Sequence, residues 1–91
     1  MYKYEVITPY NIDVDFVCRE LIEYFGDEYI TVTSGTLYSD GNILECKIFQ
    51  FVGKSLYYED MLNFRQAFDW YKMRYYKVKD VSEITNSRKN G

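Results

Sequence analysis

The chain has 91 residues, of which 47% are hydrophobic and 20% aromatic, so it can build one hydrophobic core but is too short for two. This composition excludes an intrinsically disordered chain, and the absence of histidine excludes histidine-based acid–base catalysis and most transition-metal sites. The net charge is −3, with a balance of −7 in residues 1–46 and of +4 in residues 47–91. This split predicts two unlike faces.

Residues 2–8 predict a first strand, because their polar and apolar side chains alternate and Pro9 follows. A helix is predicted over residues 14–25, where apolar residues recur at helical spacing. Asn11 or Asp13 can cap its start, and Gly26 stands where a left-handed C-terminal cap is common. In the first strand, residues 2–8, one side is predicted to carry Tyr2, Tyr4 and Val6, and the other Lys3, Glu5 and Ile7.

A hairpin is predicted next, because residues 29–38 and 43–52 are rich in β-branched and aromatic residues and flank a strong turn signal at residues 39–42. Gly35 predicts a bulge or bend in the first of these strands. Cys46 is predicted to be reduced and buried, and so is Cys18 of the preceding helix. We expect the core side of the second strand to carry Leu44, Cys46, Ile48 and Val52, with Gln50 among them. The other side, a half-exposed face or a binding surface, would carry Ile43, Glu45, Lys47, Phe49 and Phe51.

A long aromatic helix over residues 57–76 is predicted to be the element against which the rest packs. Its apolar residues follow helical steps, and no Gly or Pro interrupts it. The preceding Gly53 and Lys54 allow either a turn into a short strand over residues 55–58 or a loop in which Ser55 caps the helix. Val78 and Val81 fit a last short strand. The helical face is defined by Tyr57, Met61, Phe64, Phe68, Tyr71 and Tyr75.

Together these elements predict an α+β fold, an antiparallel sheet of three or four strands with two helices on one face. The order is β-α-β-β-α plus one short strand, before or after the second helix. A strand after the helix gives the ferredoxin-like arrangement. We expect a single domain over residues 1–84 and a disordered tail over residues 85–91.

The residues present predict neither a catalytic site nor a metal or cofactor site. Two close acidic pairs, Asp13 with Asp15 and Glu59 with Asp60, stand at expected helix starts, where acids are favoured anyway. We expect no enzyme activity. The sequence has no signal-peptide pattern and no apolar run of the roughly 20 residues that a membrane span needs, so a cytoplasmic location without membrane contact is expected.

The leading functional hypothesis is an acidic surface centred on the first helix. Such a surface can occupy a basic groove of a protein partner that otherwise holds nucleic acid. In general character the chain is similar to phage-type inhibitors of host or defence proteins, which are small, acidic and without catalytic residues. The surface is predicted to contain Asp13, Asp15, Glu20, Glu23, Asp27 and Glu28.

The alternative hypothesis is a single-stranded nucleic-acid binder. Residues 47–52, KIFQFV, resemble the third-strand motif of RNA-recognition-motif domains, and residues 19–26 resemble their first helix. The family has glycines where this chain has Ile48 and Gln50. The resemblance implies base stacking on sheet aromatics, with the site formed by Tyr2, Tyr4, Lys47, Phe49 and Phe51. A homodimer built on the aromatic helix is a third possibility.

Overall fold

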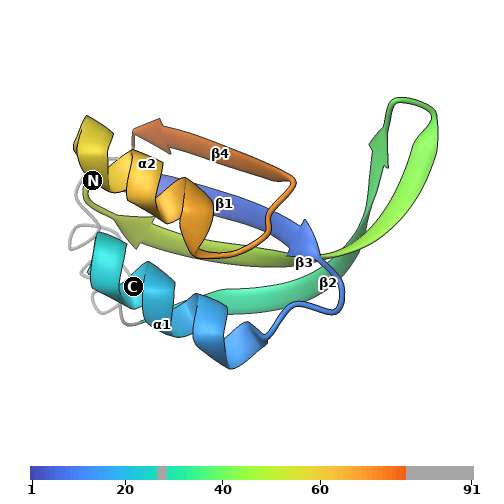
Figure 1. Ribbon diagram of the computed structural model, residues 1–91, viewed down its shortest axis with the longest axis horizontal. Coiled ribbons are helices and arrows are strands. Elements are labelled where there is room, and N and C mark those ends of the chain that lie inside the picture. Colours follow the sequence, from blue (N-terminus) through green and yellow to red (C-terminus); the bar gives the residue numbers. More distant parts are fainter. Residues whose placement is uncertain (27–28, 78–91) are drawn as a thin grey trace, which may run out of the picture.

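The computed structural model describes residues 1–26 and 29–77, which form an α+β fold (Figure 1). Four strands and two helices follow one another in the order β-α-β-β-α-β. The last strand therefore comes after the second helix, and the predicted ferredoxin-like order is confirmed. In chain order the elements are β1 (Tyr2–Pro9), α1 (Val14–Phe25), β2 (Thr31–Ser39), β3 (Asn42–Gly53), α2 (Tyr58–Ala67) and β4 (Lys72–Lys77).

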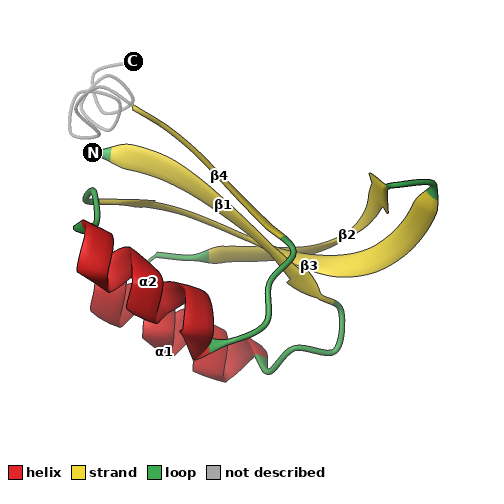
Figure 2. Cartoon of the chain, turned by 45° about the horizontal axis from the view of Figure 1, so that its top comes forward, coloured by secondary structure: helices red, strands yellow, loops and turns green. Residues whose placement is uncertain are grey.

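The four strands form one sheet in the order β2-β3-β1-β4, and every neighbouring pair is antiparallel. Both helices cover the same face of this sheet, as Figure 2 shows, and no helix of the described residues covers the other face. In Figure 1, α1 lies on the β2 side and α2 on the β4 side. The two faces below are called the helix face and the open face.

Aromatic rings from β1, β3 and both helices fill the core between the sheet and the helices. Tyr4 on β1 pairs with Phe51 on β3, and their rings stack with centroids 5.2 Å apart. Phe25 from α1 packs on both, at 4.4 Å from the Tyr4 ring and 4.9 Å from the Phe51 ring. Phe64 from α2 meets Phe25 edge to face at 5.4 Å. The predicted alternation of β1 is confirmed, because Tyr4 and Val6 lie in this core.

The predicted core side of β3 was wrong. Phe49 and Phe51 are buried among the core residues, and the strand alternation then places Ile48, Gln50 and Val52 on the open face. The large rings bury more apolar area than the aliphatic set, and this decides which side of the strand meets the helices.

The predicted helix over residues 57–76 was also wrong beyond Ala67. Phe68 has an extended backbone, with φ −160° and ψ 168°, and residues 72–77 form β4. Tyr71 and Tyr75 are four residues apart, which fits a helix, but Met73 and Tyr75 also fit the two-residue period of a strand. The apolar spacing in this segment is therefore compatible with both structures. Pairing of β4 with β1 from Tyr2 to Ile7 satisfies backbone groups that a longer helix would have satisfied locally.

Before α2, the predicted short strand over residues 55–58 is absent and the alternative prediction of a loop is confirmed. Residues 54–57 are a loop, and Tyr57 takes the N-cap position of α2 without a side-chain hydrogen bond, so Ser55 is not the cap. The predicted short strand at Val78 and Val81 and the predicted tail over residues 85–91 lie outside the described residues.

The hairpin of β2 and β3 projects beyond the helices and curls toward the open face (Figures 1 and 2). Its two-residue turn has positive φ at both Asp40 (51°) and Gly41 (78°), which defines a type I′ turn. Gly35 pairs with Cys46 inside an unbroken register, so the predicted bulge at Gly35 is absent. A Cβ at Gly35 would lie 2.8 Å from Cδ1 of Ile48, so this glycine gives the Ile48 side chain the space it occupies.

Candidate interaction surface

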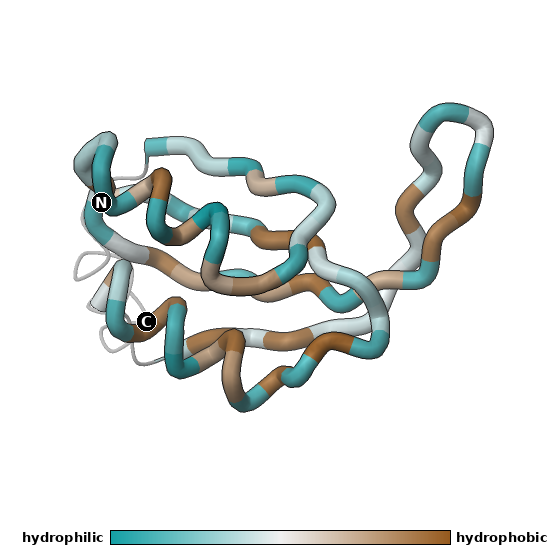
Figure 3. The backbone as a smooth tube through the Cα atoms, in the orientation of Figure 1, coloured by the Kyte–Doolittle hydropathy of each residue, from teal (hydrophilic) through white to brown (hydrophobic). Residues whose placement is uncertain are grey.

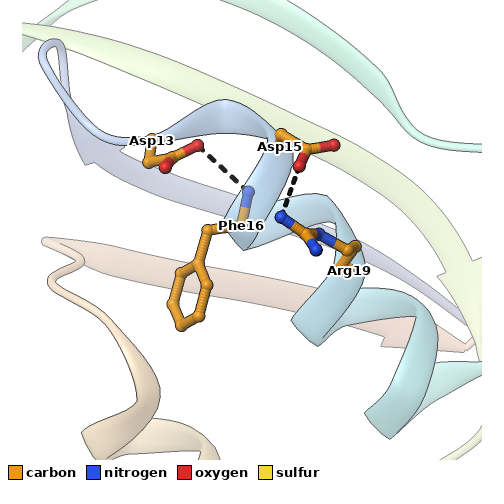
Figure 4. A network of polar contacts seen from close by, with 4 residues as sticks. All are labelled: Asp13, Asp15, Phe16 and Arg19. Atoms are coloured by element: carbon orange, nitrogen blue, oxygen red, sulfur yellow. Dashed lines mark hydrogen bonds and ion pairs between the residues drawn. The ribbon is translucent and has the colours of Figure 1, made fainter.

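Helix α1 carries the predicted acidic surface, and its first turn is held by Asp13. The Asp13 carboxylate accepts a hydrogen bond from the backbone N–H of Phe16 at 3.1 Å (Figure 4). At the other end, Gly26 has φ 78° and its N–H donates to the carbonyl of Ile22 at 2.8 Å. Both predicted caps are thus confirmed, and Asp13 has a structural role besides its charge.

Asp15 and Arg19 form an ion pair one helical turn apart, with Nη2 and Oδ2 at 2.6 Å. Both side chains are about three-quarters exposed, so this pair contributes little to stability and can exchange for another partner. In Figure 4 the Phe16 ring points away from this pair. It is 39% exposed and adds an apolar contact to the charged surface.

Glu20 and Glu23 form no ion pair with any residue that the structure describes, which keeps their charges available. Glu23 is exposed, and Glu20 is half-buried. Glu20 precedes Tyr24 by one turn, and the Tyr24 ring contacts Phe64 of α2, so Glu20 lies on the α2 side of α1. Asp27 and Glu28, the remaining predicted members of this surface, lie outside the described residues.

The open face of the sheet has the opposite charge balance. Glu5 accepts a hydrogen bond from Nε2 of Gln50 at 3.0 Å and lies 3.9 Å from Nε of Arg74, so one polar row crosses three strands. Lys3 and Lys72 share this face by strand alternation. Three cations and one carboxylate on these central and edge strands face away from the acids of α1. The open face of the described sheet is therefore net positive, whereas α1 with its N-cap is net negative.

The residues predicted for nucleic-acid binding do not form a stacking surface. Tyr4, Phe49 and Phe51 are at most 4% exposed and lie under the helices, not on the open face. Tyr2 is half-buried against Tyr75, with ring centroids 6.0 Å apart. Since bases stack on exposed rings, these side chains cannot act as the resemblance to RNA-recognition motifs implies.

Lys47, the last member of that predicted set, is held by contacts within the chain. Its ammonium lies 4.5 Å from the centre of the Tyr10 ring and donates to the hydroxyl of Ser34 at 3.2 Å. These contacts link the turn after β1 to the projecting hairpin. The lysine therefore has a structural partner on each side.

Both cysteines are unbridged; Cys46 is buried as predicted, whereas Cys18 is only half-buried. Burial, and to a smaller extent the carboxylate of Asp15, raises the pKa of Cys18. Burial also raises the pKa of Cys46, against the opposing effect of the Gly35 backbone N–H. A thiol with a raised pKa is a weak nucleophile and a weak metal ligand at neutral pH. No group of three or more metal-binding side chains occurs in residues 1–26 and 29–77.

A pocket of about 410 Å³ opens on the open face between the starts of β1 and β2 and the end of β3. Its polar lining includes Lys3, Thr31 and Gln50. The described residues that line it include no carboxylate and no thiol. Such a lining suits binding better than acid–base or nucleophilic chemistry.

Comparison with protein-family models and with curated protein sequences finds no match. In the described part of the chain, neither helix has the length and hydropathy of a membrane span.

The sequence did not predict the polar row of Glu5, Gln50 and Arg74 on the open face or the contact of Lys47 with Tyr10. The alternation of Glu5 with Tyr4 and Val6 indicated that Glu5 faces away from the core. Only the strand order brings Gln50 and Arg74 beside Glu5.

Proposed function

We propose that this protein is a non-catalytic protein-binding module that uses the acidic surface of α1 to occupy a basic surface of its partner. The proposal is supported mainly by the carboxylates of Glu20 and Glu23, which form no ion pair with a cationic side chain among the described residues. They are about 4.5 Å apart along the helix axis, a spacing comparable with that of phosphates in nucleic acid. Asp15 adds a third carboxylate on the same helix, and Asp13 a fourth at its start.

An apolar side chain beside the acids supports a protein partner over a simple counterion atmosphere. Phe16 lies one helical turn before Glu20 and is 39% exposed, although it is a large hydrophobic residue. Charge complementarity speeds association and selects the partner, whereas buried apolar anchors supply most of the affinity. A mimic of nucleic acid that inhibits a host or defence protein, in the manner of phage-type inhibitors, has this combination.

Charge reversal on α1 tests the proposal. The immobilised wild-type protein should capture nucleic-acid-binding proteins from a lysate, and duplex DNA should displace them. Glu20→Lys/Glu23→Lys should abolish this DNA-sensitive capture. A matched control, Glu45→Lys/Glu59→Lys, makes the same change in net charge on exposed residues of β3 and α2 and should leave it intact. Equal, DNA-sensitive capture by both variants, or capture that duplex DNA does not affect, would show that the acidic surface is not the binding site.

A further inference from the structure

Strand β2 is an edge of the sheet that lacks the features by which natural edge strands avoid pairing. Among the described strands it is bonded to β3 alone, through nine consecutive residue pairs without a bulge. Its sequence, TVTSGTLYS, has no charged residue and no proline. Soluble proteins usually protect such an edge with Lys, Pro or a bulge. The opposite edge, β4, has three cations in six residues, Lys72, Arg74 and Lys77.

The turn of the hairpin fixes which backbone groups of β2 point outward. In a type I′ hairpin the two residues that flank the turn, here Ser39 and Asn42, form a hydrogen-bonded pair. Bonded and non-bonded pairs then alternate along the strand. Odd-numbered residues of β2 therefore bond to β3, whereas the N–H and C=O groups of four even-numbered residues point outward, at Val32, Ser34, Thr36 and Tyr38.

We infer that this edge pairs with the same edge of a second copy of the chain, in antiparallel orientation about a two-fold axis at Gly35. The outward-pointing residues are distributed symmetrically about Gly35, which is the middle residue of β2. In this register Ser34 lies opposite Thr36 of the second copy, and Val32 lies opposite Tyr38. Each copy then satisfies the outward backbone groups of the other, and the sheet becomes continuous across eight strands.

Three features favour a second copy over a foreign strand. The edge has no charge that would select an unlike partner, and two identical uncharged edges meet without repulsion. The pairing of Val32 with Tyr38 joins a β-branched residue to an aromatic ring, a favourable cross-strand combination. The two Gly35 residues that meet at the two-fold axis have no side chains, so the two strands can approach each other there without a clash.

The exposed apolar residues next to this edge continue the contact. On α1, Ile22 lies half a turn from Tyr24, and Tyr24 contacts Phe64 of α2, so Ile22 lies on the β2 side. The two-fold axis is perpendicular to the sheet, so both α1 helices lie on the same face of the joined sheet. At the projecting end of the hairpin, Tyr38 and Ile43 are paired and more than 70% exposed. Figure 3 shows hydrophobic segments on both arms there.

Charge substitutions on the outward positions test the pairing. In Ser34→Lys/Thr36→Lys, lysines from the two copies lie directly opposite each other, and in Ser34→Glu/Thr36→Glu glutamates do. Within one chain, position 34 pairs with Lys47 and position 36 with Glu45. Each variant thus gains one favourable and one unfavourable neighbour, so the two are matched in their effect on the fold.

Sedimentation equilibrium should show a concentration-dependent dimer of the wild-type chain. Each charged variant alone should raise the dimer Kd about tenfold or more, and an equimolar mixture of the two should return it toward the wild-type value, because Lys then meets Glu. A wild-type chain that stays monomeric at the highest attainable concentration would overturn the inference. Variants that dimerise like the wild type, or a mixture that does not recover, would overturn it too.

Hydrogen exchange measured by NMR gives a second readout that depends on the alternation. The backbone amides of Ser34 and Thr36 should exchange more slowly as protein concentration rises. The amides of Thr33 and Gly35, which bond to β3, should be protected at all concentrations. Protection of Ser34 and Thr36 that does not depend on concentration would contradict pairing between copies. The carboxylates of the acidic surface are not part of this contact, so either proposal can fail without the other.

Discussion

Truncation of Phe64 to alanine should remove about half of the stability of the fold. This ring is fully buried and is the only such residue in α2. It meets Tyr24 and Phe25 of α1 edge to face at 5.6 and 5.4 Å. On its other side it contacts Phe68 at 5.4 Å and Trp70 at 6.0 Å. One side chain therefore connects α1, α2 and the segment that leads into β4.

The magnitude follows from these contacts. Replacement of a buried Phe by Ala usually costs about 3–5 kcal/mol, and the edge-to-face contacts place Phe64 near the middle or upper part of that range. A domain of this size is typically stable by roughly 5–10 kcal/mol, so we expect a loss of about 4 kcal/mol and a fall in Tm of about 15–30 °C. Phe64→Leu keeps most of the volume and should cost about 1–2 kcal/mol.

Urea unfolding followed by circular dichroism measures these differences. Leu62→Ala is the matched control, because Leu62 lies on the same helix and is 40% exposed, so its truncation should cost less than about 1 kcal/mol. The near-ultraviolet signal of the aromatic cluster should weaken in Phe64→Ala alone. If Phe64→Ala costs less than about 1.5 kcal/mol, or no more than Leu62→Ala, then Phe64 does not anchor α2 as described.

Three further outcomes are expected. Because α2 ends at Ala67, proline at Asp69 should cost less than about 1 kcal/mol, whereas proline at Asn63 inside the helix should cost about 3 kcal/mol or more; equal losses in urea unfolding would indicate a longer helix. Burial raises the pKa of Tyr4 in the folded protein above the ordinary value of 10.0. The buried neutral phenol therefore contributes fully to the free energy of unfolding below pH 10, and this contribution declines as the pH rises through the pKa of the folded state. Unfolding free energies from about pH 9 to about pH 12 should show this decline, and Tyr4→Phe should reduce it; an unchanged pH profile in the variant would assign the decline to other groups. Finally, fluorescence titration with single-stranded RNA and DNA at low salt should show no binding that depends on Phe49 or Phe51, since both rings are buried, and a loss of tight binding in properly folded Phe49→Leu or Phe51→Leu would refute this.

Local signals explain the parts of the fold that the sequence predicted correctly. The cap at Asp13, the apolar stripe from Val14 to Phe25 and the cap at Gly26 define α1 without reference to the rest of the chain. Asp40 and Gly41 define the hairpin turn in the same way, because their conformation is a property of two residues. Asp15, Glu20 and Glu23 share α1 for the same local reason, with Asp13 at the N-cap.

The errors occurred where two local readings fitted equally well. Residues 68–76 satisfy a helical spacing and a strand alternation, and only pairing with β1 selects the strand over residues 72–77. Both sides of β3 carry apolar residues, and the charges of Glu45 and Lys47 on the side of Phe49 and Phe51 made the sequence favour the wrong side as the core. That choice is made by Phe25 and Phe64, which provide the space into which the rings of β3 fit.

By itself, the sequence determined the α+β class, the first helix with both caps, the hairpin turn and the uneven distribution of charge. These depend on residues near one another in the chain. The tertiary structure alone decided where α2 ends, which face of β3 is buried and which strands form the edges of the sheet. Each of these depends on contacts between residues far apart in sequence, whose free energies exceed the small differences in local preference between helix and strand.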